Sequence, residues 1–158
     1  RSRGLGDVYK RQIIRFDVGC VYEGYCSDIA RVKVFGKPSS EQKRIYEAIL
    51  QGEQKTLESV RAKAKACDLF FRAVNYVRKA GLENYLRHHV GHGIGLRVYE
   101  PPTICPTDET PIEGNMVINF ETPYYLVGLG GFQVEDTIKV TDEGYEYLSK
   151  LERDLEYK

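Results

Sequence analysis

Four carboxylates lie inside short apolar segments of this 158-residue chain, and they constrain its fold more than any other feature. Each stands in a stretch that is typical of a β-strand, and the four are Asp17, Asp28, Glu121 and Glu135. A buried carboxylate must be paired, hydrogen-bonded or bound to a metal. One such residue usually has a structural explanation, as a turn or a salt-bridge partner. Four in one small domain favour a fold that gathers them at a metal site.

Three histidines, His88, His89 and His92, stand in a glycine-rich stretch between these acids. Carboxylate oxygens with a single imidazole suit manganese, iron, cobalt or zinc, and the four cysteines lack the spacing of a structural zinc site. Four carboxylates exceed the needs of one catalytic ion. The set therefore favours two divalent ions, roughly 3.5 Å apart, that share bridging carboxylates and a hydroxide.

The remaining pattern predicts an α+β fold with a mostly antiparallel sheet. A capping box of Ser39 and Gln42 begins an amphipathic helix over about 40–63, and a second helix runs from about Asp68, a possible N-cap, to Gly81. A terminal helix is expected from about Glu143. Strands are expected at 13–19, 26–35, 115–122 and 131–140, and the first two form a hairpin. A glycine-rich loop with short extended pieces is expected over 86–102.

Charge and composition exclude several classes of partner. Lys plus Arg and Asp plus Glu both number 23, so the formal net charge is zero. No block of like charge indicates nucleic acid or an anionic membrane, and no apolar run is long enough to span a bilayer. A peptide or small-molecule substrate fits better. The absence of a signal segment and of disulfide-type cysteine spacing favours a cytoplasmic protein with reduced thiols.

The first twelve residues differ from the rest. The segment RSRGLGDVYKRQ has no hydrophobic period and runs directly into the strand-like IIRFDVG. It resembles translated adaptor sequence at the end of an assembled reading frame, so we treat residues 1–12 as a non-native segment. The domain proper is then residues 13–158, and its natural start is expected to be missing.

Five blocks, in order and in approximate spacing, resemble the dinuclear metallopeptidases of the pita-bread fold. The blocks are FDVG, CSDIAR, HHVGHGIGL, NFETPYY and QVEDT. This superfamily includes methionine aminopeptidase, aminopeptidase P, prolidase and creatinase, and the likeness is nearest to Xaa-Pro peptidases. The resemblance covers about residues 13–145 and implies a curved antiparallel sheet with covering helices. It also implies that an N-terminal part of the domain is missing, so that 13–158 is the C-terminal part, and that the protein forms a homodimer.

The resemblance assigns the metal ligands residue by residue. Asp17 would bind one metal ion, Asp28 and Glu135 would bridge two ions, and His92 would coordinate one. Glu121 would complete the site and would act as general base and then as general acid. Manganese is the metal that we expect first, with cobalt, zinc or iron as alternatives.

The residues around the ligands depart in part from the family pattern. His88 resembles the histidine that lines the substrate pocket, whereas His89 falls at a variable position and receives no role. Where the peptidases have a second histidine at the scissile carbonyl, this chain has Tyr99, which can donate a hydrogen bond to a developing oxyanion. The arginine that usually precedes the last bridging glutamate by two residues is Gln133. These departures leave the five ligands intact but alter the residues around them.

These observations favour metal-dependent hydrolysis of a C–N amide bond through a dinuclear metal-bound hydroxide. An Xaa-Pro aminopeptidase or dipeptidase is the first hypothesis. A small-molecule amidohydrolase of the creatinase or ectoine hydrolase type is the second, and Tyr99, Gln133 and the pair Tyr124–Tyr125 would suit it. A non-catalytic binding module of the same fold is the third, against which the retention of all five ligands argues. Because the front part of the domain is missing, we do not expect this chain by itself to have the activity of the full-length protein.

Overall fold

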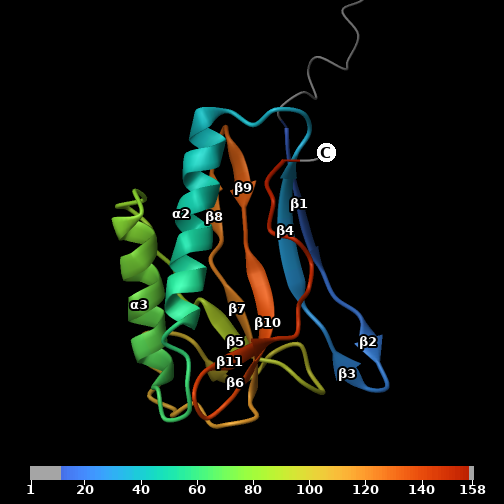
Figure 1. The fold of residues 1–158 in the computed structure, drawn as a ribbon, viewed down its shortest axis with the longest axis vertical. Helices are drawn as coiled ribbons and strands as arrows, with labels where there is room; N and C mark the ends of the chain where they lie inside the picture. The colour runs from blue at the N-terminus through green and yellow to red at the C-terminus, as the bar shows by residue number, and fades with distance from the viewer. Residues whose placement is uncertain (1–11, 157–158) are drawn as a thin grey trace, which may run out of the picture.

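An antiparallel sheet forms the centre of the computed structural model, which describes residues 12–156 (Figure 1). Along the main path the strands run in the order β1-β4-β10-β7-β5-β6, and β11 pairs with Ile138–Val140 of β10. The bounds are β1 Ile13–Val18, β4 Ile29–Val34, β5 Gly91–Gly93, β6 Glu100–Thr103, β7 Val117–Glu121, β10 Glu135–Val140 and β11 Tyr145–Tyr147. The predicted α+β class and antiparallel sheet are confirmed.

Two small ribbons extend the sheet. The hairpin predicted from the first two strands is confirmed as β1 paired with β4, and the chain between them forms β2 (Val21–Tyr22) and β3 (Tyr25–Cys26). A second ribbon, of β8 (Tyr124–Leu126) and β9 (Gly130–Phe132), connects β7 to β10. The sequence pattern predicts no strand within residues 123–130, so this ribbon differs from the prediction.

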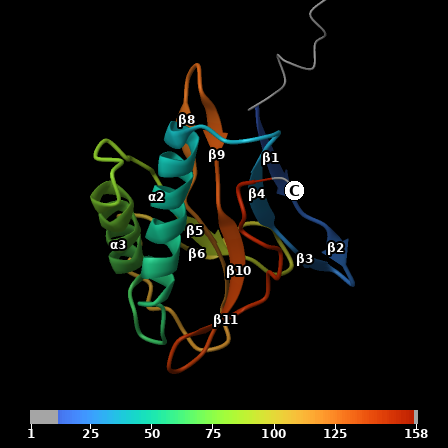
Figure 2. The same ribbon diagram turned by 45° about the horizontal axis from the view of Figure 1, so that its top comes forward.

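Two helices lie side by side next to the sheet (Figures 1 and 2). Helix α2 (Ser40–Leu57) begins at the predicted capping box, in which Ser39 Oγ accepts from the Gln42 amide and the Gln42 side chain accepts from the Ser39 amide. It ends at Leu57, six residues before the predicted end. Its Gly52 has no side chain where Val77 of α3 approaches, since a Cβ there would lie 2.1 Å from Val77 Cγ2. The glycine thus allows the two helices to pack closely.

Helix α3 (Ala66–Lys79) begins earlier than predicted. Its N-cap is Lys65, which makes no side-chain capping bond, so the prediction of Asp68 as N-cap is wrong. Asp68 instead lies in the first turn, where its negative charge interacts favourably with the helix dipole. Gly81 follows the helix at φ 107°, a conformation that terminates helices and that glycine adopts without strain.

The helix predicted from Glu143 is wrong, because residues 143–156 contain no helix. The chain turns at Gly144, whose amide donates to Thr141 Oγ1, and returns as β11 along β10. The following segment runs extended beside β4, where the Val34 amide donates to the Leu155 carbonyl. Strand pairing with β10 and β4 therefore overrides the weak helical pattern.

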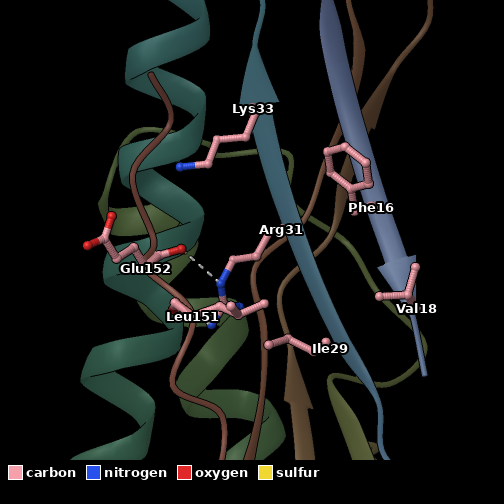
Figure 3. A pocket seen from close by; sticks show the side chains of 7 residues that line it. All are labelled: Phe16, Val18, Ile29, Arg31, Lys33, Leu151 and Glu152. Atoms are coloured by element: carbon pink, nitrogen blue, oxygen red, sulfur yellow. Dashed lines mark hydrogen bonds between the residues drawn. The ribbon is translucent and has the colours of Figure 1, made fainter. Parts of the chain in front are cut away.

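Side chains of β1 and β4 that face away from the carboxylates line an open apolar groove (Figure 3). Phe16 and Val18 of β1 stand opposite Ile29 of β4 and Leu151 of the terminal segment. Alternation along β1 places Arg15 and Asp17 on the other face.

Of the segment predicted to be non-native, residues 1–11 lie outside the described residues. No helix within residues 12–156 is long and apolar enough to cross a bilayer.

Candidate metal centre

Three of the four predicted carboxylates lie in one row across four neighbouring strands. Asp17 of β1 is paired with Ala30 of β4, Ala30 with Glu135 of β10, and Glu135 with Glu121 of β7. Directly paired residues of antiparallel strands project from the same face of a sheet. The strand register therefore brings these side chains together from positions that are up to 118 residues apart in the sequence.

The nearest approach of possible ligand atoms is among Asp28, His92 and Glu135. One atom from each lies within 4.8 Å of the others, and no other group of three or more such residues occurs among residues 12–156. Asp28 precedes β4, and His92 of β5 is paired with Asn119 of β7, two residues before Glu121. The three elements thus converge on one point of the sheet.

The imidazole of His92 is oriented for binding a cation. Its Nδ1 lies 3.0 Å from the carbonyl oxygen of Gly93, to which it donates when it carries the proton. The other nitrogen, Nε2, is buried and has no hydrogen-bond partner among residues 12–156. A neutral histidine in this tautomer presents a lone pair at Nε2, which is the usual arrangement of a metal-binding histidine.

Glycines allow the backbone around His92 to pack closely. A Cβ at Gly93 would lie 2.4 Å from the Pro101 carbonyl oxygen, and one at Gly91 would lie 2.5 Å from that of Asn119. A side chain at either position would push β5 away from β6 or β7. Both positions therefore require a residue without a side chain for close backbone approach.

The electrostatics of the carboxylates favour a bound cation. Burial raises the pKa of Glu135 to about 9, and the nearby negative charges of Asp28, Glu121 and Asp17 add to this effect. The pKa of Asp28 is also raised, first by burial and then by Asp17. Without a counter-charge these acids therefore resist ionisation together, and divalent cations would remove that penalty.

Gln133 connects two of the carboxylates. Its Nε2 donates to Glu121 Oε2 at 3.2 Å and to Glu135 Oε2 at 3.1 Å. Asn119 Nδ2 donates to the other oxygen of Glu135 at 2.6 Å. Gln133 was a departure from the family pattern without an assigned function, and here it orients Glu121 beside Glu135.

Three flanking residues, His88, His89 and Tyr99, differ in how they approach the predicted ligands. His89, which received no role, has Nε2 at 2.8 Å from Glu121 Oε1. His88 is exposed, and its ring contacts that of His89 at 4.2 Å between centroids. The ring of Tyr99 stacks on that of His92 at 3.9 Å. His89 is thus the histidine that contacts a predicted ligand. This contact follows from the fold, and no local sequence pattern indicates it.

Asp17 lies outside the group of three. Its Oδ2 is 2.7 Å from Arg15 Nη1, and both side chains are partly exposed. The structure therefore brings Asp28, His92 and Glu135 together, adds Glu121 through Gln133, and places Asp17 at the β1 end of the row with an arginine as partner.

Comparison with known proteins decides which fold family this arrangement represents. The profile described as metallopeptidase family M24 matches residues 2–142. The chain belongs to metallopeptidase family M24. This membership confirms the resemblance to pita-bread metallopeptidases that the five sequence blocks indicated.

Several members of family M24 are similar to the chain over part of their length. An Xaa-Pro dipeptidase of Pyrococcus horikoshii is 38% identical over 148 residues, which are 94% of this chain and 42% of that protein. The structure of an X-Pro aminopeptidase from Thermotoga maritima superposes with a TM-score of 0.89 at 32% identity, over 94% of this chain and 42% of the other. The chain thus spans about two fifths of the length of these M24 relatives.

A more distant structure shares the fold alone. The N-terminal domain of the FACT complex subunit SPT16 from chickpea has a TM-score of 0.84 at 21% identity, over 94% of this chain and 38% of the other. The sheet and the two helices of the M24 chain therefore match the pita-bread architecture, which more than one type of protein uses.

Proposed function

We propose that this chain contributes the metal-binding part of an Xaa-Pro peptidase, which hydrolyses the amide bond before a proline. One observation carries the proposal. A ligand atom of His92, whose buried Nε2 has no hydrogen-bond partner among residues 12–156, lies within 4.8 Å of carboxylate oxygens of Asp28 and Glu135, in a chain whose relatives include an Xaa-Pro dipeptidase. This donor set of oxygens and one imidazole suits a divalent cation such as manganese.

Five residues would hold two divalent ions. They are Asp17, Asp28, His92, Glu121 and Glu135. When bound, the ions would supply hydroxide near neutral pH and would polarise the scissile carbonyl. Cobalt, zinc and iron suit the same donors, and manganese is our first proposal.

The chain's own residues would move the protons. Glu121 is buried beside Glu135 and within 2.8 Å of His89 Nε2. A carboxylate in this position can take a proton from the attacking water and give it to the leaving amine. Tyr99 would donate to the developing oxyanion from its place against His92, and His88 would line the substrate pocket. A cytoplasmic location and a homodimer are further parts of this proposal.

A small-molecule amidohydrolase of the creatinase or ectoine hydrolase type is a second candidate. Gln133 favours it, because an uncharged amide stands between Glu121 and Glu135 where the peptidase pattern has a guanidinium. A non-catalytic module is disfavoured, since such a module has no need to keep the ligands together.

Substrate assays distinguish these candidates. The full-length protein that carries this chain, supplied with manganese or cobalt, is assayed for release of the N-terminal residue from Xaa-Pro peptides and for hydrolysis of ectoine and creatine. Turnover of the peptides alone is expected. Bound metal without turnover of any of these substrates would contradict both enzyme proposals.

Replacement of Glu121 tests the proton transfer. We expect Glu121→Gln to keep the fold but to lower turnover by more than roughly a hundredfold, the scale of general acid-base catalysis. Glu113→Gln, which changes an exposed glutamate before β7, is the matched control and should leave turnover unchanged. An unaltered rate in Glu121→Gln would remove this residue from the mechanism.

A further inference from the structure

Within residues 12–156, the hydrogen bonds of the Arg15 side chain go to Asp17, a proposed metal ligand, to Gln133, which contacts two others, and to Tyr125. Through Nη1 alone it contacts Asp17 Oδ2 at 2.7 Å, Tyr125 Oη at 3.4 Å and Gln133 Oε1. β1 thus places a permanent positive charge at one end of the row of carboxylates. The histidine at the other end, His89, is charged only when protonated.

The contact with Gln133 determines which way its amide points. Gln133 Oε1 accepts from Arg15 and from the hydroxyl of Tyr125, which lies 3.3 Å away. With the oxygen held on that side, the two protons on Nε2 point to Glu121 and Glu135. A reversed amide would set Oε1 against two carboxylates, which offers them no donor. Arg15 therefore acts on two buried ligands through one intermediate side chain.

We propose that Arg15 is a positioning residue of the metal centre. It holds the carboxylate of Asp17 directly and orients those of Glu121 and Glu135 through the amide of Gln133. It also keeps a guanidinium beside these acids in a chain whose residue 133 lacks one. The inference rests on the proposed function only in that these three residues are taken as metal ligands.

A role in stability alone does not explain these contacts. The side chains of Arg15 and Asp17 are 36% and 38% exposed, and exposed ion pairs stabilise folded proteins little. We therefore expect Arg15→Met, which keeps the apolar stem, to leave the fold intact. Arg72→Met removes an exposed arginine of α3 and serves as the matched control.

The first test uses the metal-free chain. In the parent chain the side-chain amide protons of Gln133 should exchange slowly with solvent, and their NMR signals should be displaced from those of a free glutamine amide, as expected of an amide held at both ends. Arg15→Met should move these signals toward the free-glutamine positions and speed their exchange, whereas Arg72→Met should not. Unchanged Gln133 signals in Arg15→Met would overturn the inference, whatever the metal affinity of the chain.

The second test measures Mn²⁺ binding by calorimetric titration. Arg15→Met should weaken binding by about 10–100-fold, the usual effect of losing a partner that orients metal ligands. Arg15→Lys should retain most of the affinity, since one nitrogen makes all three contacts. The double variant Arg15→Met with Gln133→Arg should recover affinity, because it restores a guanidinium next to the acids.

Different results would contradict the positioning role of Arg15 and the proposed function. Equal Mn²⁺ affinity in Arg15→Met and the parent chain would overturn the positioning role. Absence of Mn²⁺ binding by the parent chain would contradict the proposed function, and the Gln133 signals would then still decide whether Arg15 orients the amide.

Discussion

Glu135 is a buried carboxyl of the proposed metal site whose protonation depends strongly on its surroundings. It is buried, it lies between Ala30 and Glu121 in the row, and its pKa is raised from 4.5 to about 9. Near neutral pH the metal-free fold thus holds a proton that a bound cation would displace. Binding of a metal should accordingly release protons and weaken as the pH falls.

This raised pKa predicts how the stability of the metal-free chain depends on pH. Between pH 4.5 and about 9 the folded state keeps a proton on Glu135 that the unfolded state has lost. The free energy of unfolding should therefore decrease as pH rises through this window. In thermal unfolding with a chelator present, Glu135→Gln should flatten the decline in Tm.

The matched control is Glu113→Gln, which should keep the slope of the parent chain. A residual slope in Glu135→Gln is expected from Asp28, whose pKa is also raised. A parent chain whose Tm is constant or rises over this range would contradict the prediction.

At the residue scale, the sequence marks the four acids and His92 as candidate metal ligands but does not show which residues contact them. Apolar flanks mark a carboxylate as unusual, and that signal is local. The contacts of His89 with Glu121 and of Arg15 with Gln133 join residues 32 and 118 positions apart in the sequence. They depend on strand register, which no local pattern shows. His89 lies at a position where the family varies, so the resemblance also gave it no weight.

Among the elements, helix α2 shows how a local signal can determine a helix start. The capping box of Ser39 and Gln42 satisfies two backbone amides that the helix itself leaves without acceptors. Ser39→Ala should lower the free energy of unfolding by about 1 kcal/mol. Chemical denaturation measures this loss of free energy. The control Ser40→Ala, which removes an exposed hydroxyl one residue later, should have little effect on the free energy of unfolding. Equal loss in both variants would show that the cap contributes nothing specific.

Element ends without such a signal were predicted less well. Lys65 caps α3 without a side-chain bond, so the sequence offered no residue to mark that start, and Asp68 was the nearest typical one. The segment after Glu143 is predicted as a helix, but it folds back as a hairpin in which Tyr145 of β11 lies opposite Val140 of β10. The turn at Gly144 and this strand pairing override the weak helix propensity.

For the whole molecule, a buried ion cluster joins parts that are distant in the sequence. The fully buried Asp136 of β10 accepts from Arg31 of β4 at 2.6 Å and from Arg153 of the terminal segment at 2.7 Å. Arg31 also donates to the Leu151 and Glu152 carbonyls. The cluster therefore fixes the terminal segment against the sheet.

Removing the charge of Asp136 should destabilise the entire fold. Asp136→Asn leaves two arginines without their shared carboxylate, and breaking a buried pair costs about 3–5 kcal/mol. We expect a loss at the lower end of this range. Asp136 helps to raise the pKa of the buried Glu53, so its replacement would lower that pKa, and an ionised Glu53 would then supply a negative charge near the two arginines. The free energy of unfolding of Asp136→Asn is measured by chemical denaturation and compared with that of Asp142→Asn, which changes an exposed aspartate. A loss below about 1 kcal/mol, the scale of a surface pair, would contradict the prediction.

The row formed by Asp17, Ala30, Glu135 and Glu121 has a consequence for folding. If two of these strands paired one residue out of register, a similar sheet could form, but one strand's carboxylate would project from the opposite face. That misfolded chain would no longer offer the complete set of ligands. A cation present during synthesis would thus stabilise only correctly registered chains, so that metal binding at the proposed site would favour the correct strand register during folding.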